Sequence, residues 1–154
     1  MKIGNLKIDN PVFLAPMAGI SDLPYRRLMK RFGAALVYTE MISANGLHYG
    51  GGGTRELLIS HAEERPLGVQ VFGSDPEYLA EAARYVAPHG ELIDINMGCP
   101  VKKVIRGGAG SALLREPLLV ASIIRAVRKA TTLPLTVKIR SGWDQGARNY
   151  LEIG

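Results

Sequence analysis

The sequence predicts an α/β protein that forms part of a (β/α)8 TIM barrel, with about five β/α units present. Apolar, strand-like runs alternate with helix-like segments along the whole chain. This alternation is typical of a parallel sheet whose strands are joined by right-handed helical crossovers. Several strands also carry polar residues at every second position near their carboxyl ends, where a barrel forms its active site.

The first expected strand is the apolar run VFLAP at 12–16, which ends at a proline. The segment after it predicts a helix with Ser21 or Asp22 as its N-cap. The buried face of this helix should follow i, i+3, i+4, i+7 spacing and consist of Tyr25, Leu28, Met29 and Phe32. Its solvent face should consist of Arg26, Arg27, Lys30 and Arg31.

The later elements continue the alternation. Four further strands are expected at 35–41, 67–73, 91–97 and 133–141. Helices are expected from Asp75 to about Val86, from about Ser111 to Ala130, and from Gln145 onwards. The buried stripe of the longest helix should consist of Val120, Ile123, Ile124 and Val127.

Two architectures fit this order of elements, an open doubly wound sheet and a barrel. In an open sheet the strands are covered on both faces, so they consist of continuous apolar residues. Here polar residues alternate with apolar ones near the strand ends: Gln70, Asp94, Asn96, Lys138 and Arg140, with Glu40 ending the second strand. A ring of polar groups at successive strand ends favours the barrel.

A complete barrel needs about 250 residues, whereas the chain has 154. We therefore expect a partial sequence from which the remaining barrel strands are absent. Five strands alone would leave the edges of the sheet open and prone to aggregation.

The composition is that of a globular protein, with 47% hydrophobic and 21% charged residues. The single cysteine excludes an internal disulfide and fits a reducing compartment. No run approaches the roughly 20 apolar residues of a membrane span, and no signal peptide opens the chain, so we expect a cytoplasmic protein without a membrane partner. The net charge of +5 fits a polyanionic partner, and it fits solvated helix faces equally well.

Cys99 follows the fourth strand in the sequence NMGCP, where Gly98 and Pro100 predict a tight turn. A free cysteine is commonly a small buried apolar residue, but a position at a strand end favours a functional thiol. The thiol pKa of about 8.5 can be shifted towards neutrality. Because no histidine follows in this strand or its loop, a proton donor is favoured over a Cys–His nucleophile.

Lys138 should point into the barrel, since Val137 and Ile139 point to the helix layer. An unpaired buried ammonium is costly, so its partner should be a carboxylate such as Glu40 or Asp94, or a bound cofactor. The inward amide of Gln70 could bond either a heterocycle edge or the main chain.

The loop RGGAGSALL (106–114) could present N–H groups to an anion, although the start of a helix alone explains its glycines. Lys102, Lys103 and Arg106 form a basic edge beside Cys99 that suits a phosphate-bearing substrate or a solvated loop. The three histidines lack ligand-like spacing, so we expect no metal site.

The segments APMAGISDLPYR, TEM, VQVFG, DINMGCPVKKV, GGAGSALL and VKIRSGWD, in this order and spacing, resemble the tRNA-dihydrouridine synthases. The resemblance is closest to the bacterial B-type branch and spans essentially the whole chain. It implies that residues 1–154 are the N-terminal part of an FMN-binding TIM-barrel domain, which a small helical tRNA-binding domain would follow. In this family NADPH reduces the flavin, a hydride passes to C6 of a uracil in tRNA, and the motif cysteine protonates C5.

The resemblance also assigns roles to residues of this chain. Cys99 would be the proton donor. The FMN-binding residues would be Pro16, Met17, Ala18, Gln70, Lys138 and Asn96. The substrate-binding residues would be Asn96 and Lys103, with Arg106 on the same basic edge. The implied partners are tRNA and NADPH. The sequence leaves the oligomeric state open, and we expect a monomer for the full-length protein.

The family's later strands supply a histidine near the flavin and the phosphate-binding loops. We therefore expect that residues 1–154 alone neither hold FMN tightly nor turn over. Two other functions stay open: an FMN-dependent oxidoreductase of a free pyrimidine, similar to dihydroorotate or dihydropyrimidine dehydrogenases, and a non-catalytic RNA-binding protein.

Overall fold

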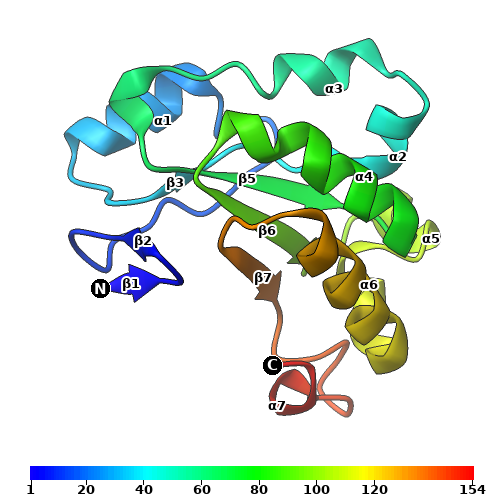
Figure 1. The fold of residues 1–154 in the computed structure, drawn as a ribbon. Coiled ribbons are helices and arrows are strands. Elements are labelled where there is room, and N and C mark those ends of the chain that lie inside the picture. Colours follow the sequence, from blue (N-terminus) through cyan, green and yellow to red (C-terminus); the bar gives the residue numbers. More distant parts are fainter.

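The computed structural model describes residues 1–51 and 53–154. Within these residues a curled parallel sheet forms a half-barrel, with helices along its outer face (Figure 1). The sheet consists of β3 (Val37–Tyr38), β4 (Ile42–Ser43), β5 (Leu67–Phe72), β6 (Leu92–Met97) and β7 (Leu135–Ile139). Strands β3, β5, β6 and β7 are neighbours in that order, and β4 also pairs with β5. The predicted partial barrel is confirmed.

The first two predicted strands are shorter than expected. The run 12–16 contributes only one parallel bridge, between Phe13 and Leu36. Pro11 and Pro16 flank this bridge, and a proline has no N–H to donate to a ladder. The run 35–41 is interrupted because the N–H of Gln70 bonds the side chain of Thr39 at 3.1 Å, so β3 and β4 are separate.

Seven α-helices lie within the described residues: α1 (Leu23–Arg31), α2 (Ala44–His48), α3 (Gly52–Glu56), α4 (Pro76–Val86), α5 (Lys102–Arg106), α6 (Pro117–Ala130) and α7 (Tyr150–Ile153). Short 3₁₀ turns are η1 (Ala62–Glu64), η2 (Ala87–His89) and η3 (Gly110–Arg115). Asp22 and Asp75 cap α1 and α4 by accepting main-chain N–H bonds. Among the described residues, no helix combines the length and apolarity needed to cross a membrane.

The predicted helix 111–130 is divided at Glu116, which has ψ 65°. The residue before a proline is disfavoured in the helical region, and Pro117 then opens α6 at its first turn. The segment before it forms η3 instead. The predicted stripe is confirmed on α6, where Val120, Ile123 and Val127 are buried and Ile124 is partly buried.

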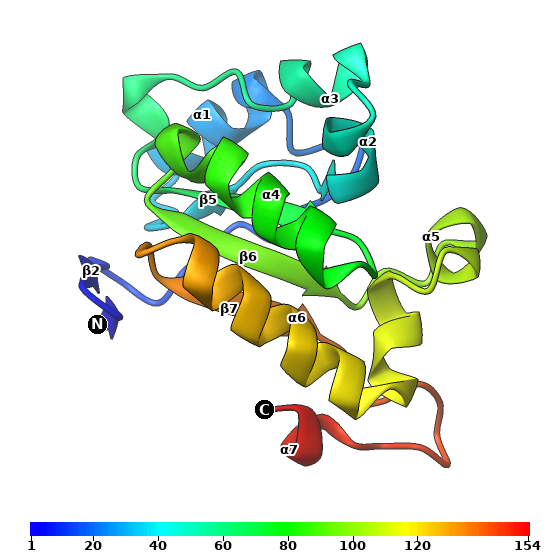
Figure 2. The ribbon, with the colours of Figure 1, turned by 45° about the vertical axis from the view of Figure 1, so that its right-hand side comes forward.

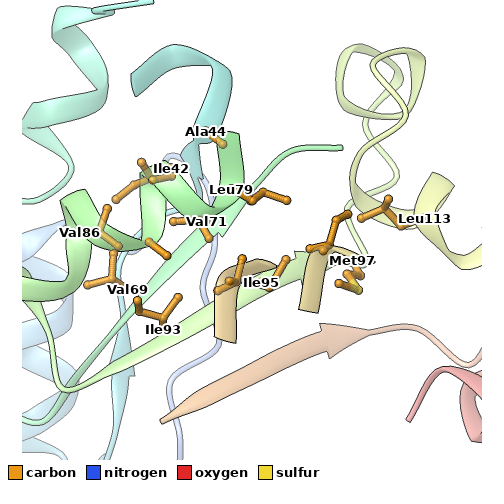
Figure 3. Close-up of a cluster of buried hydrophobic side chains, with 14 of the residues drawn as sticks. Ile42, Ala44, Val69, Val71, Leu79, Val86, Ile93, Ile95, Met97 and Leu113 are labelled. Carbon is orange, nitrogen blue, oxygen red and sulfur yellow. The ribbon is translucent and has the colours of Figure 1, made fainter. Parts of the chain in front are cut away.

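The main core lies between the sheet and helices α2, α4 and α6 (Figures 2 and 3). The sheet contributes every second residue of its strands: Val69 and Val71 from β5, and Ile93, Ile95 and Met97 from β6, all 0% exposed. Each such side chain contributes roughly 1.5–3 kcal/mol through burial. This period-two burial leaves the alternate residues for the opposite, concave face of the sheet.

A hairpin of β1 (Lys2–Ile3) and β2 (Leu6–Lys7) precedes the barrel and was not predicted. Gly4 takes a φ of +58° in its turn, which glycine adopts without steric cost. Ile3, Leu6 and the buried Ile8 pack against Leu36, Tyr38 and Leu92. These partners include the first residue of β6, so the hairpin covers the amino-terminal end of the half-barrel.

The predicted orientation of α1 is wrong in part, although Met29 packs against the buried Val37 and Leu67 and Arg31 is exposed, as expected. Arg26, expected in solvent, is 2% exposed, whereas Leu28 and Phe32, expected in the core, are 46% and 77% exposed. The reason is a buried ion pair between Arg26 and Glu64 of η1, 38 residues away in the sequence. A helical periodicity read from apolar residues alone does not identify such a partner.

Candidate active site

Cys99 lies in a turn directly after β6 and is half-buried. The side-chain oxygen of Asn96 accepts hydrogen bonds from the N–H groups of Gly98 at 3.1 Å and Cys99 at 2.9 Å. The carbonyl oxygen of Cys99 accepts from the N–H of Ser111 at 3.0 Å. The Nε of Arg140 donates to the carbonyl oxygen of Gly98 at 2.6 Å. The main chain that carries the thiol is therefore held on both sides.

The glycine-rich loop 106–114 packs against this turn. Gly110 has a φ of +61°, and a Cβ atom there would lie 2.5 Å from the carbonyl oxygen of Cys99. Gly108 has a φ of +73° and faces Ser74, whose hydroxyl donates to the carbonyl oxygen of Gly107 at 2.6 Å. The glycines thus allow a close approach of two main-chain segments, which accounts for their presence without an anion.

A buried polar layer crosses the concave face of the sheet next to Cys99. Gln70, Asp94 and Thr136 are aligned on β5, β6 and β7, as are Asn96 and Lys138 on β6 and β7. The Nε2 of Gln70 and the hydroxyl of Thr136 each donate to a different oxygen of Asp94 at 2.6 Å. The prediction that Gln70, Asp94 and Asn96 face inward on one side of the sheet is confirmed, since they are 1%, 4% and 9% exposed within this layer.

Burial raises the pKa of Asp94 above its ordinary value, because the carboxylate has lost its hydration. Its hydrogen bonds from Gln70 and Thr136 and the charge of Lys138 act in the opposite direction. Tyr38 is affected similarly: burial, followed by the nearby charge of Asp94, raises its pKa to about 12. Both groups favour their neutral forms more than the same groups in water.

Tyr38 reaches this layer because the neighbouring strand has a glycine opposite it. Gly68 is the pairing partner of Tyr38, and a Cβ at Gly68 would lie 2.4 Å from Cδ1 of the tyrosine ring. Any larger residue at position 68 would force the ring to move. Gly68, Tyr38, Thr136 and Arg140 were not among the predicted site residues, although Thr136 and Arg140 continue the alternation of Lys138.

A cleft of about 310 Å³ opens over the polar layer. Its lining combines apolar residues with a few polar groups: Ile3, Phe13, Leu14, Ala15, Pro16, Tyr38, Asp94, Thr136, Val137 and Lys138. Its volume is at the lower end of the roughly 300–1,000 Å³ typical of small-molecule sites. Apolar walls, a buried hydrogen-bonding floor and one ammonium group suit a flat heteroaromatic ring with carbonyl oxygens at its edge, such as a flavin.

Lys138 does not have the buried environment expected from the sequence. It faces the cleft, as predicted, but its side chain is exposed. No carboxylate of the described residues lies within ion-pairing distance of it. The half-barrel leaves this side of the sheet open to solvent, so the ammonium stays hydrated and needs no internal partner.

The segment APMAG enters the cleft only through Ala15 and Pro16; Met17 and Ala18 do not line it. The hydroxyl of the buried Ser21 donates to the carbonyl oxygen of Met17 at 3.0 Å and accepts from its N–H at 2.9 Å. The carboxylate of Glu40 accepts a hydrogen bond from the N–H of Gly19. The loop is therefore fixed at both ends by side chains.

The buried side chain of Arg26 bonds the end of the loop that contains APMAG. Its Nη1 donates to the carbonyl oxygen of Ser21 at 2.9 Å, and its Nη2 donates to that of Ile59 at 2.9 Å. Its Nε bonds Glu64 at 2.6 Å, and Glu64 also accepts from the N–H of His61 at 2.8 Å. The fully hydrogen-bonded pair connects η1 and α1 to the loop that borders the cleft.

Lys103 and Arg106 lie on α5 with exposed side chains, together with Lys102. Helix α5 lies at the carboxyl ends of β5 and β6, beyond the Cys99 turn (Figure 1). The structure therefore separates the predicted substrate-binding cations from the cleft: neither Lys103 nor Arg106 lines it, and Cys99 does not line it either. Among the residues that the structure describes, no group of three or more His, Cys, Asp or Glu side chains is arranged to hold a metal ion.

A second basic surface lies at the opposite end of the strands. A groove of about 410 Å³ between the carboxyl ends of α4 and α6 is lined by Arg84, Arg128 and Lys129, among others. These residues precede β6 and β7, so the groove is remote from Cys99. It does not belong to the candidate site.

Comparisons with known proteins agree with this arrangement. Residues 13–154 match the family model described as dihydrouridine synthase (Dus). Proteins named tRNA-dihydrouridine synthase B are similar to the chain: that of Xanthomonas axonopodis pv. citri is 51% identical over 153 residues, that of Pasteurella multocida 48% over 154, and that of Pseudomonas aeruginosa 47% over 154. These alignments cover 97%, 99% and 99% of this chain and 45%, 46% and 46% of the relatives.

The chain thus spans about half the length of the curated relatives it matches. The match to the family model extends over nearly all of it and includes every element that forms the cleft from Phe13 onwards. The resemblance inferred from the sequence motifs is confirmed. The chain belongs to the dihydrouridine synthase family.

Proposed function

We propose that the protein reduces uridine to 5,6-dihydrouridine in tRNA, as an oxidoreductase that uses NADPH and FMN. The observation that carries the proposal is the position of Cys99. In a chain of this family, its thiol sits on a turn at the end of β6, the strand whose Asp94 lines the cleft, and three neighbours hold that turn by hydrogen bonds. Residues 1–154 would act as the N-terminal part of the FMN-binding barrel domain.

In this proposal Pro16, Gln70 and Lys138 take part in holding FMN. Pro16 and Lys138 line the cleft, where the ammonium can donate to a carbonyl edge, and Gln70 lies buried beneath it. Met17 and Ala18 would contact the group through main-chain atoms of the adjoining loop. FMN, when bound and reduced by NADPH, supplies the hydride for C6 of the uracil.

The protein's own contribution to the reaction is a proton. Cys99 delivers its S–H proton to C5 as the C5–C6 double bond is reduced, and the resulting thiolate regains a proton from water. The overall change consumes one NADPH and one proton for each uridine. Asn96 would orient the substrate or the flavin beside the thiol.

The substrate in this proposal is a polymeric RNA, because the cations of α5 extend beyond the Cys99 turn. Lys103 and Arg106 are exposed on α5. The residue after this helix, Gly107, accepts a hydrogen bond from Ser74, which anchors the end of the helix. Such cations neutralise phosphates of the nucleic-acid backbone and add affinity without reading sequence. We place this work in the cytoplasm.

The test compares substrates with the full-length protein under reducing conditions with NADPH. Unmodified tRNA should oxidise the reduced protein and gain dihydrouridine, detected as a mass increase of digested nucleosides. Free uracil and uridine should react slowly or not at all. Equal rates with free uracil and tRNA would favour an oxidoreductase of free pyrimidines, and no reaction with either would favour a non-catalytic RNA-binding protein.

A further inference from the structure

A line of hydrogen bonds connects the buried carboxylate of Asp94 to the main chain of Cys99. The Nε2 of Gln70 donates to Oδ2 of Asp94 at 2.6 Å. The Nδ2 of Asn96 donates to Oε1 of Gln70 at 3.0 Å. The Oδ1 of Asn96 then accepts from the N–H of Cys99 at 2.9 Å. We refer to Asp94, Gln70 and Asn96 as the amide chain.

The hydrogen bonds at the Cys99 end of the amide chain allow the amide groups of Asn96 and Gln70 only one orientation. Main-chain N–H groups can donate but not accept, so the Asn96 atom that faces Gly98 and Cys99 has to be oxygen. The nitrogen of Asn96 is then directed to Gln70. It can donate only to the oxygen of that side chain, which turns the nitrogen of Gln70 towards Asp94.

The hydrogen bonds at the Asp94 end require the same amide orientation, for a separate reason. A carboxylate is an acceptor at both oxygens, and one of them already accepts from the hydroxyl of Thr136. In the ionised form of Asp94, the other oxygen can therefore pair only with a donor, which is the nitrogen of Gln70. The two ends agree, and a reversal of either amide would place oxygen against oxygen or nitrogen against N–H.

Burial of the three side chains stabilises this orientation of the amide groups. Gln70 is 1% exposed, Asp94 4% and Asn96 9%. Water therefore has little access to compensate a reversed amide, and buried polar groups without partners are strongly disfavoured. The orientation of the Asn96 oxygen depends in this way on a carboxylate two residues earlier on the same strand.

We propose that Asp94 and Gln70 are positioning residues: they hold the amide of Asn96 in one orientation and thereby fix the Cys99 turn at the carboxyl end of β6. This role rests on the proposed function in that Cys99 is its proton donor. Asp94 itself need not touch the substrate. Asp94 acts through Gln70 and Asn96, and it controls the position of the Cys99 thiol.

The first variant that tests this is Asn96→Asp. The new carboxylate can still accept from Gly98 and Cys99, but its second oxygen faces the oxygen of Gln70. If Gln70 turns over, its oxygen faces Asp94 instead, so one contact between two acceptors is always left. The defect should grow with pH, because a protonated carboxyl could supply the missing donor.

The second variant is the double exchange Asp94→Asn with Asn96→Asp. Here an amide at 94 can donate to the oxygen of a turned-over Gln70, whose nitrogen then donates to the carboxylate at 96. The second oxygen of that carboxylate accepts from Gly98 and Cys99, and the hydroxyl of Thr136 still donates to position 94. Every group is paired again, in the reverse direction and with the same total charge.

The measurements are hydrogen exchange of the Cys99 N–H and the rate of Cys99 alkylation by iodoacetamide, in the full-length protein between about pH 6 and about pH 9. Asn96→Asp should speed exchange by about tenfold, because the amide chain that fixes the turn loses roughly one hydrogen bond, and it should change the alkylation rate. The double variant should return both values to within about twofold of the parent. Glu116→Gln is the matched control and should change neither, because it removes an exposed charge whose side chain makes no hydrogen bond to the described residues.

Rescue by the double variant supports the proposal. A double variant as impaired as Asn96→Asp, or an Asn96→Asp protein with parental exchange and alkylation at every pH, overturns it. Neither measurement uses dihydrouridine formation, so the outcome is separate from that of the proposed function. A catalytically dispensable Cys99 would remove the function but leave the amide chain intact.

Discussion

Gly110 packs directly against the main chain of Cys99. A Cβ atom at Gly110 would lie 2.5 Å from the carbonyl oxygen of Cys99 and 3.2 Å from its Cβ, and the φ of Gly110 is +61°. Two constraints therefore coincide at one residue, a left-handed backbone and a contact too close for any side chain. The turn that carries the thiol depends on a residue eleven positions later in the sequence.

Gly110→Ala should displace the Cys99 turn. The positive φ alone costs roughly 1–2 kcal/mol for an alanine, and the contact with Cys99 adds to that. We expect a lower free energy of unfolding in urea and a changed rate of Cys99 alkylation.

Gly33→Ala is the matched control for this prediction. Gly33 has a φ of +96°, but a Cβ there would meet nothing within 4 Å. It should lose stability through backbone strain only and leave Cys99 alkylation unchanged. Parental alkylation in Gly110→Ala would show that the turn does not depend on this contact.

Arg26→Met should be strongly destabilising. It leaves the carboxylate of Glu64, which is 0% exposed, without its charged partner, and the loss of one partner of a buried pair costs roughly 3–5 kcal/mol. Replacing both residues by apolar ones, Arg26→Met with Glu64→Leu, should recover much of the loss. Urea denaturation followed by circular dichroism measures both.

The neighbouring pair of Arg27 and Glu63 provides the comparison, since both side chains are partly exposed at an N–O distance of 2.9 Å. Arg27→Met should have a much smaller effect, because water and salt screen exposed pairs. Similar losses from Arg26→Met and Arg27→Met would contradict a special role for the buried pair.

Asp94 should make stability depend on pH in a predictable direction. Burial raises its pKa, so the folded protein keeps a proton on Asp94 at pH values where the unfolded chain has released it. The free energy of unfolding should therefore fall as the pH rises from the ordinary aspartate pKa to the raised one. Asp94→Asn should lack this decline, as measured by urea denaturation at a series of pH values.

Asp144→Asn, which removes an exposed carboxylate, should keep the parental dependence on pH. If the parent and Asp94→Asn proteins have parallel profiles, the carboxyl of Asp94 titrates alike in the folded and unfolded states. The account of its environment would then be wrong.

Lys103→Gln combined with Arg106→Gln should weaken tRNA binding by the full-length protein. If both cations contact phosphates, the slope of log K against log salt should become shallower by about 1–2. The double variant Arg84→Gln with Lys129→Gln removes two cations from the groove at the opposite end of the strands, and it should bind like the parent. Equal losses in the two double variants would indicate that net charge, rather than the position of α5, determines binding.

The alternation of polar and apolar residues on β5, β6 and β7 was enough to predict the concave face. Gln70, Asp94 and Asn96 were predicted to face inward and do, because period-two burial is a local property of a strand. The break before Pro117 was missed although its signal is local, since the residue before a proline avoids the helical region.

The other errors arose where residues distant in the sequence determine the structure. The orientation of α1 depends on Glu64, and the interruption between β3 and β4 depends on a bond from Gln70 to Thr39. Neither partner is near in sequence. The anchoring of Cys99 by Arg140 and Gly110 likewise requires knowing which loops meet at the end of β6.

The most direct test of the central claim is the dihydrouridine content of tRNA from cells that carry Cys99→Ala as their only copy of the full-length protein. Nucleoside mass spectrometry should find that the dihydrouridine restored by the parent protein is lost with Cys99→Ala, while the variant protein still accumulates and folds. Undiminished dihydrouridine in the Cys99→Ala cells would contradict the claim that this thiol supplies the proton.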